Sequence, residues 1–153
     1  MTFPISCYII PITSVQATKD GERMILKIDF NSDEAFYLQL CNQIILGIAM
    51  ETFCEGDPLP SVRSLADQIG INMHTVNKAY SILRQEGFVK LDRRKGAIIS
   101  LDIDKLQALE ELRQNLYVVL ARGICKNISR TEVHQLVDEI YNVFSKNSGT
   151  QAE

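Results

Sequence analysis

The fold of this 153-residue chain is decided by the stretch GDPLPSVRSLADQIGINMHTVNKAYSILRQEG, residues 56–87. Ser61 can cap a short helix, and Gly70 is the left-handed terminator that such a helix needs. Asn72 can cap a second helix, which ends at Gly87. Two helices joined by only three residues predict a helix-turn-helix.

A periodic segment precedes this motif. Apolar residues recur at helical spacing over residues 36–52, which predicts an amphipathic helix that Asn31, Ser32 or Asp33 could cap. The helix is expected to stop before residues 55–60, where one glycine and two prolines impose a tight, extended connection.

Two strand-like runs follow the motif. They cover residues 88–91 and 97–101 and enclose the polar segment 92–96, three of whose residues are basic. We therefore expect a β-hairpin with a basic tip. A hairpin placed directly after a helix-turn-helix forms the wing of a winged helix.

The remaining chain is predicted to form two helices. An apolar stripe extends to Gly123, and Ser129 with Glu132 makes a capping box that opens the second helix. Two helices of this length cannot cover their apolar residues by touching each other alone, so they need the winged domain or a second copy of the chain. Dimerisation is the simpler interpretation. The residues predicted to form the dimer are Leu109, Leu112, Leu116, Val133, Leu136 and Ile140.

The expected fold class is mainly α with a small β-hairpin wing. Residues 24–101 are expected to form a winged helix-turn-helix that opens with a strand over residues 25–30, followed by a helical dimerisation tail over residues 102–146 and a flexible C-terminus over residues 147–153. Residues 1–23 show no clear period and are interpreted as an N-terminal extension. A methionine directly follows this extension, so the true start of the protein stays open.

Charge is distributed unevenly along the chain. The whole sequence carries a formal net charge of −3, whereas residues 61–100 carry seven Lys or Arg against three Asp or Glu. A basic middle between acidic ends is expected when one face of a protein meets a polyanion. Chance is the competing explanation for this distribution.

The spacing of cysteines and histidines argues against a metal site, a cofactor or a disulfide framework. Cys7, Cys41, Cys54 and Cys125 show no CxxC spacing, and the two histidines do not cluster with them. We expect Cys41 and Cys125 to be small buried hydrophobes of a reducing compartment. No stretch approaches the length of a membrane span or looks like a secretory signal, which predicts a cytoplasmic protein without membrane contact. No nucleophile–base pair or phosphate loop is visible, so no enzymatic activity is expected.

Residues 36–101 resemble the DNA-binding domain of GntR-family regulators. The resemblance rests on Gly-Asp-x-Leu-Pro-Ser-x-Arg at residues 56–63 and on Thr-Val-x-Lys-Ala at residues 75–79. The short two-helix tail looks like that of the YtrA-type subgroup, in which such a tail forms the dimer. The resemblance implies a bacterial regulator, repressor-like, that binds a palindromic operator in double-stranded DNA as a homodimer.

The resemblance also implies roles for individual residues. Arg63 corresponds to the arginine that reaches DNA from the helix before the recognition helix. The residues from 74 to 78 begin the recognition helix, which enters the major groove, and the residues from 93 to 96 correspond to the wing tip at the minor groove. Tyr80 is expected to pack with its hydroxyl near the phosphate backbone. The implied DNA-contacting residues are Ser61, Arg63, Asn72, His74, Thr75, Asn77, Lys78, Tyr80, Arg93, Arg94, Lys95 and Gly96.

The sequence departs from the family pattern at two positions. Met73 stands where many relatives have an arginine, so one guanine or phosphate contact is expected to be absent. Arg94 replaces a glycine that is common in the wing turn, which puts the geometry of this turn in question while it adds positive charge.

Each DNA-binding role has a structural alternative. Arg63 could pair with Asp67 one turn further on, and His74 and Lys78 could be solvated helix residues without a base contact. The basic wing tip could serve only to keep the hairpin soluble. For the whole domain, the alternative is a winged helix used for protein–protein contact, with the basic hairpin as a docking edge. A small-molecule effector, if the protein has one, is expected between the domain and the tail or at the dimer interface.

Overall fold

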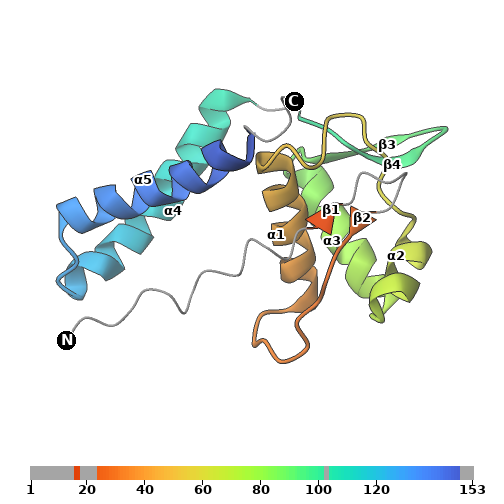
Figure 1. Cartoon of the computed structure of the whole chain (residues 1–153), viewed down its shortest axis with the longest axis horizontal. Coiled ribbons are helices and arrows are strands. Elements are labelled where there is room, and N and C mark those ends of the chain that lie inside the picture. Colours follow the sequence, from red (N-terminus) through yellow and green to blue (C-terminus); the bar gives the residue numbers. More distant parts are fainter. Residues whose placement is uncertain (1–15, 18–23, 102–103, 149–153) are drawn as a thin grey trace. The chain divides into compact units, whose positions relative to one another are not determined.

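The computed structural model describes residues 16–17, 24–101 and 104–148, whose path is drawn in colour in Figure 1. The chain divides into two compact units, with the boundary after Leu101. The first unit contains the helix-turn-helix and its hairpin, and the second contains the helices of the tail.

In its described part, the first unit combines three helices with two short antiparallel hairpins. It contains, in chain order, β1 (Gln16–Ala17), β2 (Met24–Ile25), α1 (Phe36–Ala49), α2 (Val62–Ile69), α3 (Met73–Gln85), β3 (Val89–Asp92) and β4 (Gly96–Ile99). β1 pairs with β2, and β3 pairs with β4. The three helices with the β3–β4 hairpin form a winged helix-turn-helix, which confirms the predicted fold class.

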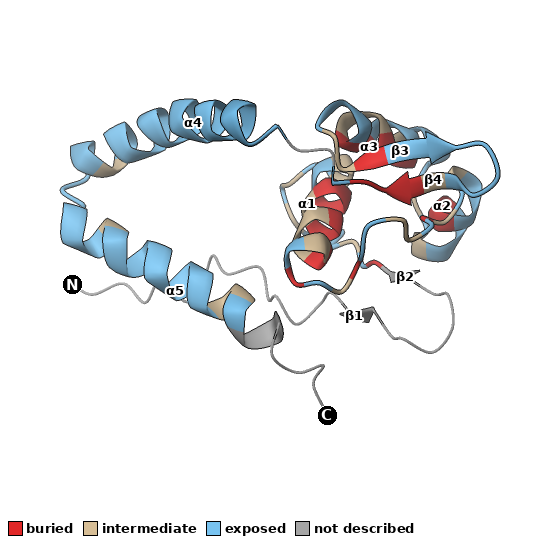
Figure 2. Ribbon diagram, turned by 90° about the horizontal axis from the view of Figure 1, so that it is seen from above, coloured by how far each residue is buried: buried red, intermediate tan, exposed pale blue. Residues whose placement is uncertain are grey.

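One apolar core holds the three helices and the wing together. Its members come from every helix of the unit and from both strands of the wing. The largest fully buried side chains are Leu40, Ile44, Leu65, Val76, Leu83 and Ile99. In Figure 2 the buried residues of this unit are red on the ribbons of its helices and wing. Burying an aliphatic side chain of this size contributes about 1.5–3 kcal/mol, so the core fixes which face of α3 points outward.

The caps of α2 and α3 confirm the sequence prediction. Ser61 Oγ accepts a hydrogen bond from Ser64 N at 3.2 Å, and Asn72 Oδ1 accepts one from His74 N at 2.8 Å. Gly70 has a φ of 73°, the left-handed conformation that ends a short helix. The turn between the two helices is therefore fixed by local interactions.

The predicted cap of α1 is wrong. The helix begins at Phe36, and Ala35 occupies its N-cap position without a side-chain hydrogen bond. Ser32, one of the predicted caps, is used locally, because its Oγ accepts the backbone N–H two residues further on at 3.1 Å. The helix also ends at Ala49, before the predicted end, and Glu51 behind it adopts a positive φ of 57°.

Two buried glutamines of α1 hold the segment that precedes the helix. Lys27 N donates to Gln43 Oε1 at 3.0 Å, and Asp29 N donates to Gln39 Oε1 at 2.9 Å. The same side-chain amides also act as donors, since Gln43 Nε2 donates to Lys27 O and Gln39 Nε2 donates to Asp29 O. The strand predicted over residues 25–30 therefore ends early, since side-chain amides take the place of a neighbouring strand beyond β2.

A close contact fixes the chain where it leaves α1. The backbone N–H groups of Thr52 and Phe53 both donate to Gly47 O, at 2.9 and 3.1 Å, and the Phe53 side chain is buried. A methyl group on Gly47 would lie 2.3 Å from the Phe53 ring, well inside the van der Waals distance. The glycine is therefore needed for the turn that leads towards α2.

Gly47→Ala should destabilise the protein, although alanine is preferred over glycine in helices by about 1 kcal/mol. Overpacking a core typically costs about 1–3 kcal/mol, so we expect the free energy of unfolding in urea to fall by about 1 kcal/mol or more. In a Phe53→Leu background the ring is gone, and the same change should cost much less. Equal losses in both backgrounds would show that the ring does not limit residue 47.

The second unit consists of two long helices, α4 (Lys105–Cys125) and α5 (Arg130–Ser148). The predicted capping box opens α5, because Ser129 N donates to Glu132 Oε2 at 2.7 Å and Glu132 N donates to Ser129 Oγ at 3.3 Å. The pKa of the Glu132 carboxyl is lowered by the Ser129 hydroxyl, which donates to Oε2 at 2.7 Å, and by the Ser129 N–H. The N-terminus of α5 is thus specified by residues close in sequence.

The connection between α4 and α5 differs from the prediction. Gly123, expected to end the first helix, lies inside α4, and the reversal falls at Asn127, which has a φ of 60°. Ile128 N donates to Gly123 O at 3.0 Å, and the Ile128 side chain lies 3.7 Å from the position that a Cβ on Gly123 would take. A Cβ at this position would make only an ordinary van der Waals contact, so the reversal at Asn127 does not depend on a glycine at 123.

Candidate nucleic-acid interface

α3 presents a polar face to the surface. Its buried side chains are Val76, Ala79, Tyr80 and Leu83. His74, Asn77 and Lys78 are exposed, and His74 and Lys78 lie one turn apart on the side opposite this stripe. A helix that is anchored on one face and polar on the other can enter the major groove of DNA, which is about 12 Å wide.

The first turn of α3 holds three more residues of interest. Asn72 uses its side-chain oxygen to cap the helix, and Thr75 N donates to Asn72 O at 3.0 Å. Thr75 is half-buried, whereas Met73 is 49% exposed. This chain therefore presents an apolar side chain at the tip of α3.

Ser61 and Arg63 lie at the start of α2, and both are exposed. In the described part of the chain the one ion pair joins Arg113 to Glu110 in α4, so Arg63 does not pair with Asp67. The structure therefore does not support the alternative role of Arg63 as a partner of Asp67. Its planar guanidinium is available for a bidentate contact to guanine or phosphate.

Lys78 reaches across to α1. Its Nζ lies 3.7 Å from the centroid of the Tyr37 ring, which stands on the first turn of α1. An ammonium group over an aromatic face makes a cation–π contact. Lys78 is therefore more than a solvated helix charge, and Tyr37 is a residue of this region that sequence reasoning missed.

Tyr80 points into the protein. Its hydroxyl donates to Pro60 O at 2.8 Å, and the residue is only 7% exposed. Burial raises the pKa of this phenol well above its ordinary value. The hydroxyl therefore ties α3 to the loop before α2, and its predicted place near the phosphate backbone stays a prediction.

The wing tip is closed by an aspartate and a glycine. Asp92 Oδ1 accepts hydrogen bonds from Arg94 N at 2.7 Å and Lys95 N at 2.8 Å. Gly96 pairs with Asp92 and takes the positive φ of 77°. Arg94 has no positive φ, so the loss of a glycine at this position leaves the turn intact. Arg93, Arg94 and Lys95 are all exposed.

The loop before α2 pairs with the inner strand of the wing. Leu59 N donates to Ala97 O at 2.8 Å and Gly56 N donates to Ile99 O at 2.9 Å. Ile99 N in turn donates to Asp57 O at 2.9 Å. Because Ser61 and Arg63 follow this loop, the start of α2 and the wing belong to one rigid frame.

A hollow of about 280 Å³ opens between the start of α2, α3 and the wing. Its lining includes Ser61, Asn77, Ser81, Arg84, Leu91 and Gly96. Three of these were already predicted to meet DNA, so the hollow lies within the candidate interface. Arg84 was missed, because its place in the last turn of α3 gives no sign that the wing stands opposite.

Five of the six residues predicted to form the dimer are exposed. They lie on α4 and α5, which are mostly pale blue in Figure 2. Leu109, Leu112, Leu116, Leu136 and Ile140 are between 41% and 52% exposed, and Val133 is half-buried. No residue of α4 is buried. The two helices therefore leave apolar faces without a partner inside their own unit.

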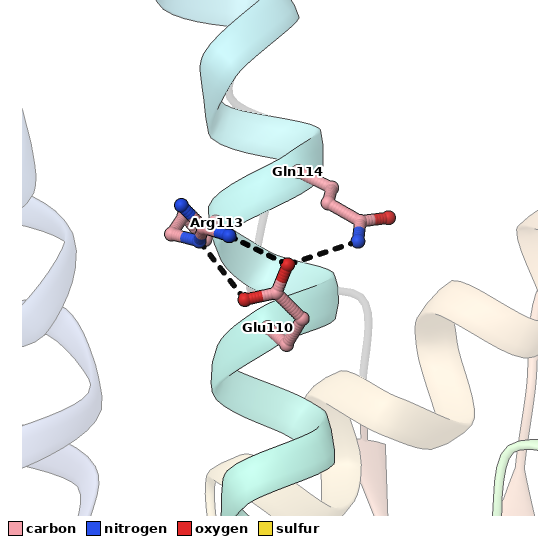
Figure 3. A network of polar contacts seen from close by, with 3 residues as sticks. All are labelled: Glu110, Arg113 and Gln114. Atoms are coloured by element: carbon pink, nitrogen blue, oxygen red, sulfur yellow. Dashed lines mark hydrogen bonds and ion pairs between the residues drawn. The ribbon is translucent and has the colours of Figure 1, made fainter.

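On α4, a network of polar contacts pairs the Arg113 guanidinium with a carboxylate of the same helix (Figure 3). Arg113 donates from Nε and Nη2 to the two carboxylate oxygens of Glu110 at 2.9 and 2.8 Å, and Gln114 Nε2 donates to the same carboxylate at 3.0 Å. These contacts lower the pKa of Glu110 and raise that of Arg113. Arg113 is thus not counted among the cations of the candidate interface.

Other chemistry finds little support in the described residues. They contain no group of His, Cys, Asp and Glu that could hold a metal ion, and none of their helices is both long and apolar enough for a membrane span. Cys41 is buried as predicted, and burial raises the pKa of its thiol to about 11. Cys125 was predicted to be buried but is exposed near the end of α4, and Cys7 lies outside the described residues.

Comparison with known proteins gives the relatives of this chain. Residues 36–99 match the family described as bacterial regulatory proteins, gntR family. The chain is 31% identical over 99 residues to the uncharacterized HTH-type transcriptional regulator YhcF of Bacillus subtilis, covering 65% of this chain and 79% of that protein. It is 38% identical over 76 residues to the HTH-type transcriptional repressor YtrA of Bacillus subtilis, covering 50% and 58%.

A solved structure extends the similarity into the tail. The crystal structure of a transcriptional antiterminator from Listeria monocytogenes superposes with a TM-score of 0.71 at 26% identity, over 86% of this chain and 98% of that one. Fold and surface together define a winged helix-turn-helix transcription regulator. The chain belongs to the GntR family of bacterial regulators, whose members bind DNA through this domain and are not enzymes.

Asp92→Ala should loosen the wing tip. The N–H groups of Lys95 and Arg94 lower the pKa of the Asp92 carboxyl below its ordinary 3.8. The Asp92 carboxylate therefore stabilises the wing tip fully at a pH above its ordinary pKa. This stabilisation is lost as the pH falls through the lower pKa that the carboxyl has in the folded protein. At neutral pH we expect faster amide hydrogen exchange at Arg94 and Lys95 in the variant.

Asp92→Asn, which keeps one acceptor oxygen, is the matched control and should protect these two amides better than alanine does. The wild-type protein should lose the same protection only in acid. Unchanged exchange rates in Asp92→Ala would show that the turn does not depend on the carboxylate.

Proposed function

We propose that the protein represses transcription as a homodimer that binds a palindromic operator. In each half-site α3 would enter the major groove and the β3–β4 wing would reach the adjacent minor groove. The observation that carries the proposal is the polar, exposed face of α3 on the same rigid frame as a basic wing tip. The similarity of the chain to the repressor YtrA supports repression over activation.

The proposed contacts divide into two kinds. Arg63, His74 and Asn77 have planar groups that can bond to base edges, and they carry the sequence preference. Lysines and the wing tip meet phosphates, which fix the position of the protein on the duplex without reading sequence. Tyr80 is left out, since its hydroxyl is bound inside the protein. The proposed DNA-contacting residues are Ser61, Arg63, Asn72, His74, Thr75, Asn77, Lys78, Arg93, Arg94, Lys95 and Gly96.

The proposed dimer forms through the tail. The apolar faces of α4 and α5 are exposed in one chain, and contiguous apolar surface of this kind is typical of an association site. A second copy offers a complementary surface through a two-fold axis. Two DNA-binding domains related by this axis would read two inverted half-sites, which is the reason for proposing a palindromic operator.

The place of action follows from the partner. A regulator that binds operator DNA in a bacterium works in the cytoplasm, and we propose this location for the chain. The YtrA-type subgroup is proposed on the short helical tail together with the similarity to YtrA. An effector would bind at the tail or at the dimer interface, where apolar surface is available.

Leu136→Asp together with Ile140→Asp should convert the dimer into a monomer. Both side chains are more than 40% exposed on the apolar face of α5, and charges there would have to be buried in the dimer. Sedimentation should give half the wild-type mass, and operator affinity should fall because one half-site supplies only part of the contacts. Gln135→Asp with Asn142→Asp adds the same charge to exposed polar positions of α5 and should leave the dimer intact. A dimer that survives Leu136→Asp with Ile140→Asp would contradict the proposed interface.

Alanine at Arg93, Arg94 and Lys95 tests DNA binding itself. Three phosphate contacts per subunit make six per dimer, and each neutralised phosphate contributes about 0.9 to the log–log dependence of affinity on salt. We therefore expect the salt slope to become shallower by up to about 5, on operator and random duplex alike. The operator is obtained by sequencing genomic fragments that the protein retains.

The matched control removes three charges from α4 and its C-cap instead, by alanine at Lys105, Arg122 and Lys126. It should leave the salt slope unchanged. Wild-type protein that shows no salt-sensitive binding to any duplex would reject the DNA-binding proposal and favour a winged helix that contacts protein.

A further inference from the structure

The contact between Lys78 and Tyr37 links the recognition helix to the first turn of α1. Lys78 Nζ lies 3.7 Å from the ring centroid, and the Lys78 side chain stays exposed. Tyr37 is half-buried and packs against the core, so its ring does not move freely. A mobile cation is thus held by a fixed aromatic face.

This arrangement limits what Lys78 can do. A lysine side chain has many rotamers, and binding that immobilises it loses conformational freedom. The ring removes part of that freedom before DNA arrives. The aromatic face occupies one side of the ammonium group, which keeps N–H donors on its other side, since lysine has three of them.

The position of Lys78 decides which part of DNA it would meet. It follows His74 by one helical turn on the outward face of α3, and it lies on the side of that face nearest α1. A compact ammonium group is suited to a phosphate, whereas bidentate base contacts favour arginine or amide side chains. In the described residues Lys78 has no carboxylate partner that would compete with a phosphate.

We infer that Tyr37 is a positioning residue for DNA binding, which acts by holding the Lys78 ammonium where it meets a backbone phosphate beside the major groove. The inference rests on the proposed DNA-binding function. It assigns the role to the aromatic ring and not to the phenol hydroxyl. The same ring therefore serves two purposes, since it also packs α1 against the core.

The test measures affinity for a random-sequence duplex, because a phosphate contact does not depend on the operator. Tyr37→Leu keeps an apolar side chain against the core but removes the ring, and should weaken binding about two- to fivefold per bound subunit, the strength of an exposed cation–π contact. Tyr37→Phe keeps the ring and should bind like wild type. Phe36→Leu is the matched control, because the Phe36 ring stacks edge-on with Phe30 instead of Lys78.

A double-mutant cycle shows whether Tyr37 acts through Lys78. Lys78→Met should weaken binding and make the salt slope shallower by about 0.9 per subunit. Adding Tyr37→Leu to Lys78→Met should then cause no further loss. Additive losses would overturn the inference, and so would a Tyr37→Phe variant as weak as Tyr37→Leu, which would assign the effect to the hydroxyl.

Two further measurements keep the test decisive if Tyr37→Leu does not fold. In the first, Tyr37 is replaced by phenylalanine residues that carry an increasing number of ring fluorines, which withdraw electrons from the ring and leave its shape nearly unchanged. Affinity should fall with each added fluorine, and a series with constant affinity would overturn the inference. The Lys78 Hε protons should show an upfield ring-current shift in wild type and in Tyr37→Phe. Wild-type protein that binds no duplex would instead reject the proposed function itself.

Discussion

The pairing of the loop before α2 with β4 is the constraint on which the rest of the candidate interface depends. Three backbone hydrogen bonds between residues 56–59 and residues 97–99 turn the two-stranded wing into a three-stranded arrangement at its base. Without them, the N–H and C=O groups of this proline-rich loop would need other partners. With them, α2 and the wing keep a fixed relation to α3, and polar residues distant in sequence form one surface.

The parts of the fold that could be predicted from the sequence are those set by neighbours along the chain. The caps at Ser61 and Asn72 and the capping box at Ser129 each use atoms two or three residues apart, and all were predicted. What could not be predicted has two causes. The expected cap of α1 gave way to a local turn at Ser32, whereas the hydrogen bond of the Tyr80 hydroxyl to Pro60 O is a tertiary contact that no local pattern indicates.

The residues of the candidate site also divide into those set by neighbours along the chain and those set by tertiary contacts. Exposed cations such as Arg63 and those of the wing tip could be selected from the motif, because helix period and turn chemistry place them outside. Tyr37 could not, since its link to Lys78 joins α1 to α3 across 41 positions and leaves no local pattern. In the tail, periodicity identifies the apolar side of each helix but not the surface that covers it.

The glutamine contacts before α1 have a consequence for how this protein can change over generations. Gln39 and Gln43 bind backbone atoms of Lys27 and Asp29, and Gln39 Nε2 also donates to Glu34 O at 2.9 Å, so any residue except proline at positions 27 and 29 offers the same N–H and C=O groups. The side chains at positions 27 and 29 are therefore expected to tolerate substitution, whereas Gln39 and Gln43 are not. Selection on the entry to the domain is expected to act on the two glutamines of α1 and on the buried Leu26 more than on positions 27 and 29.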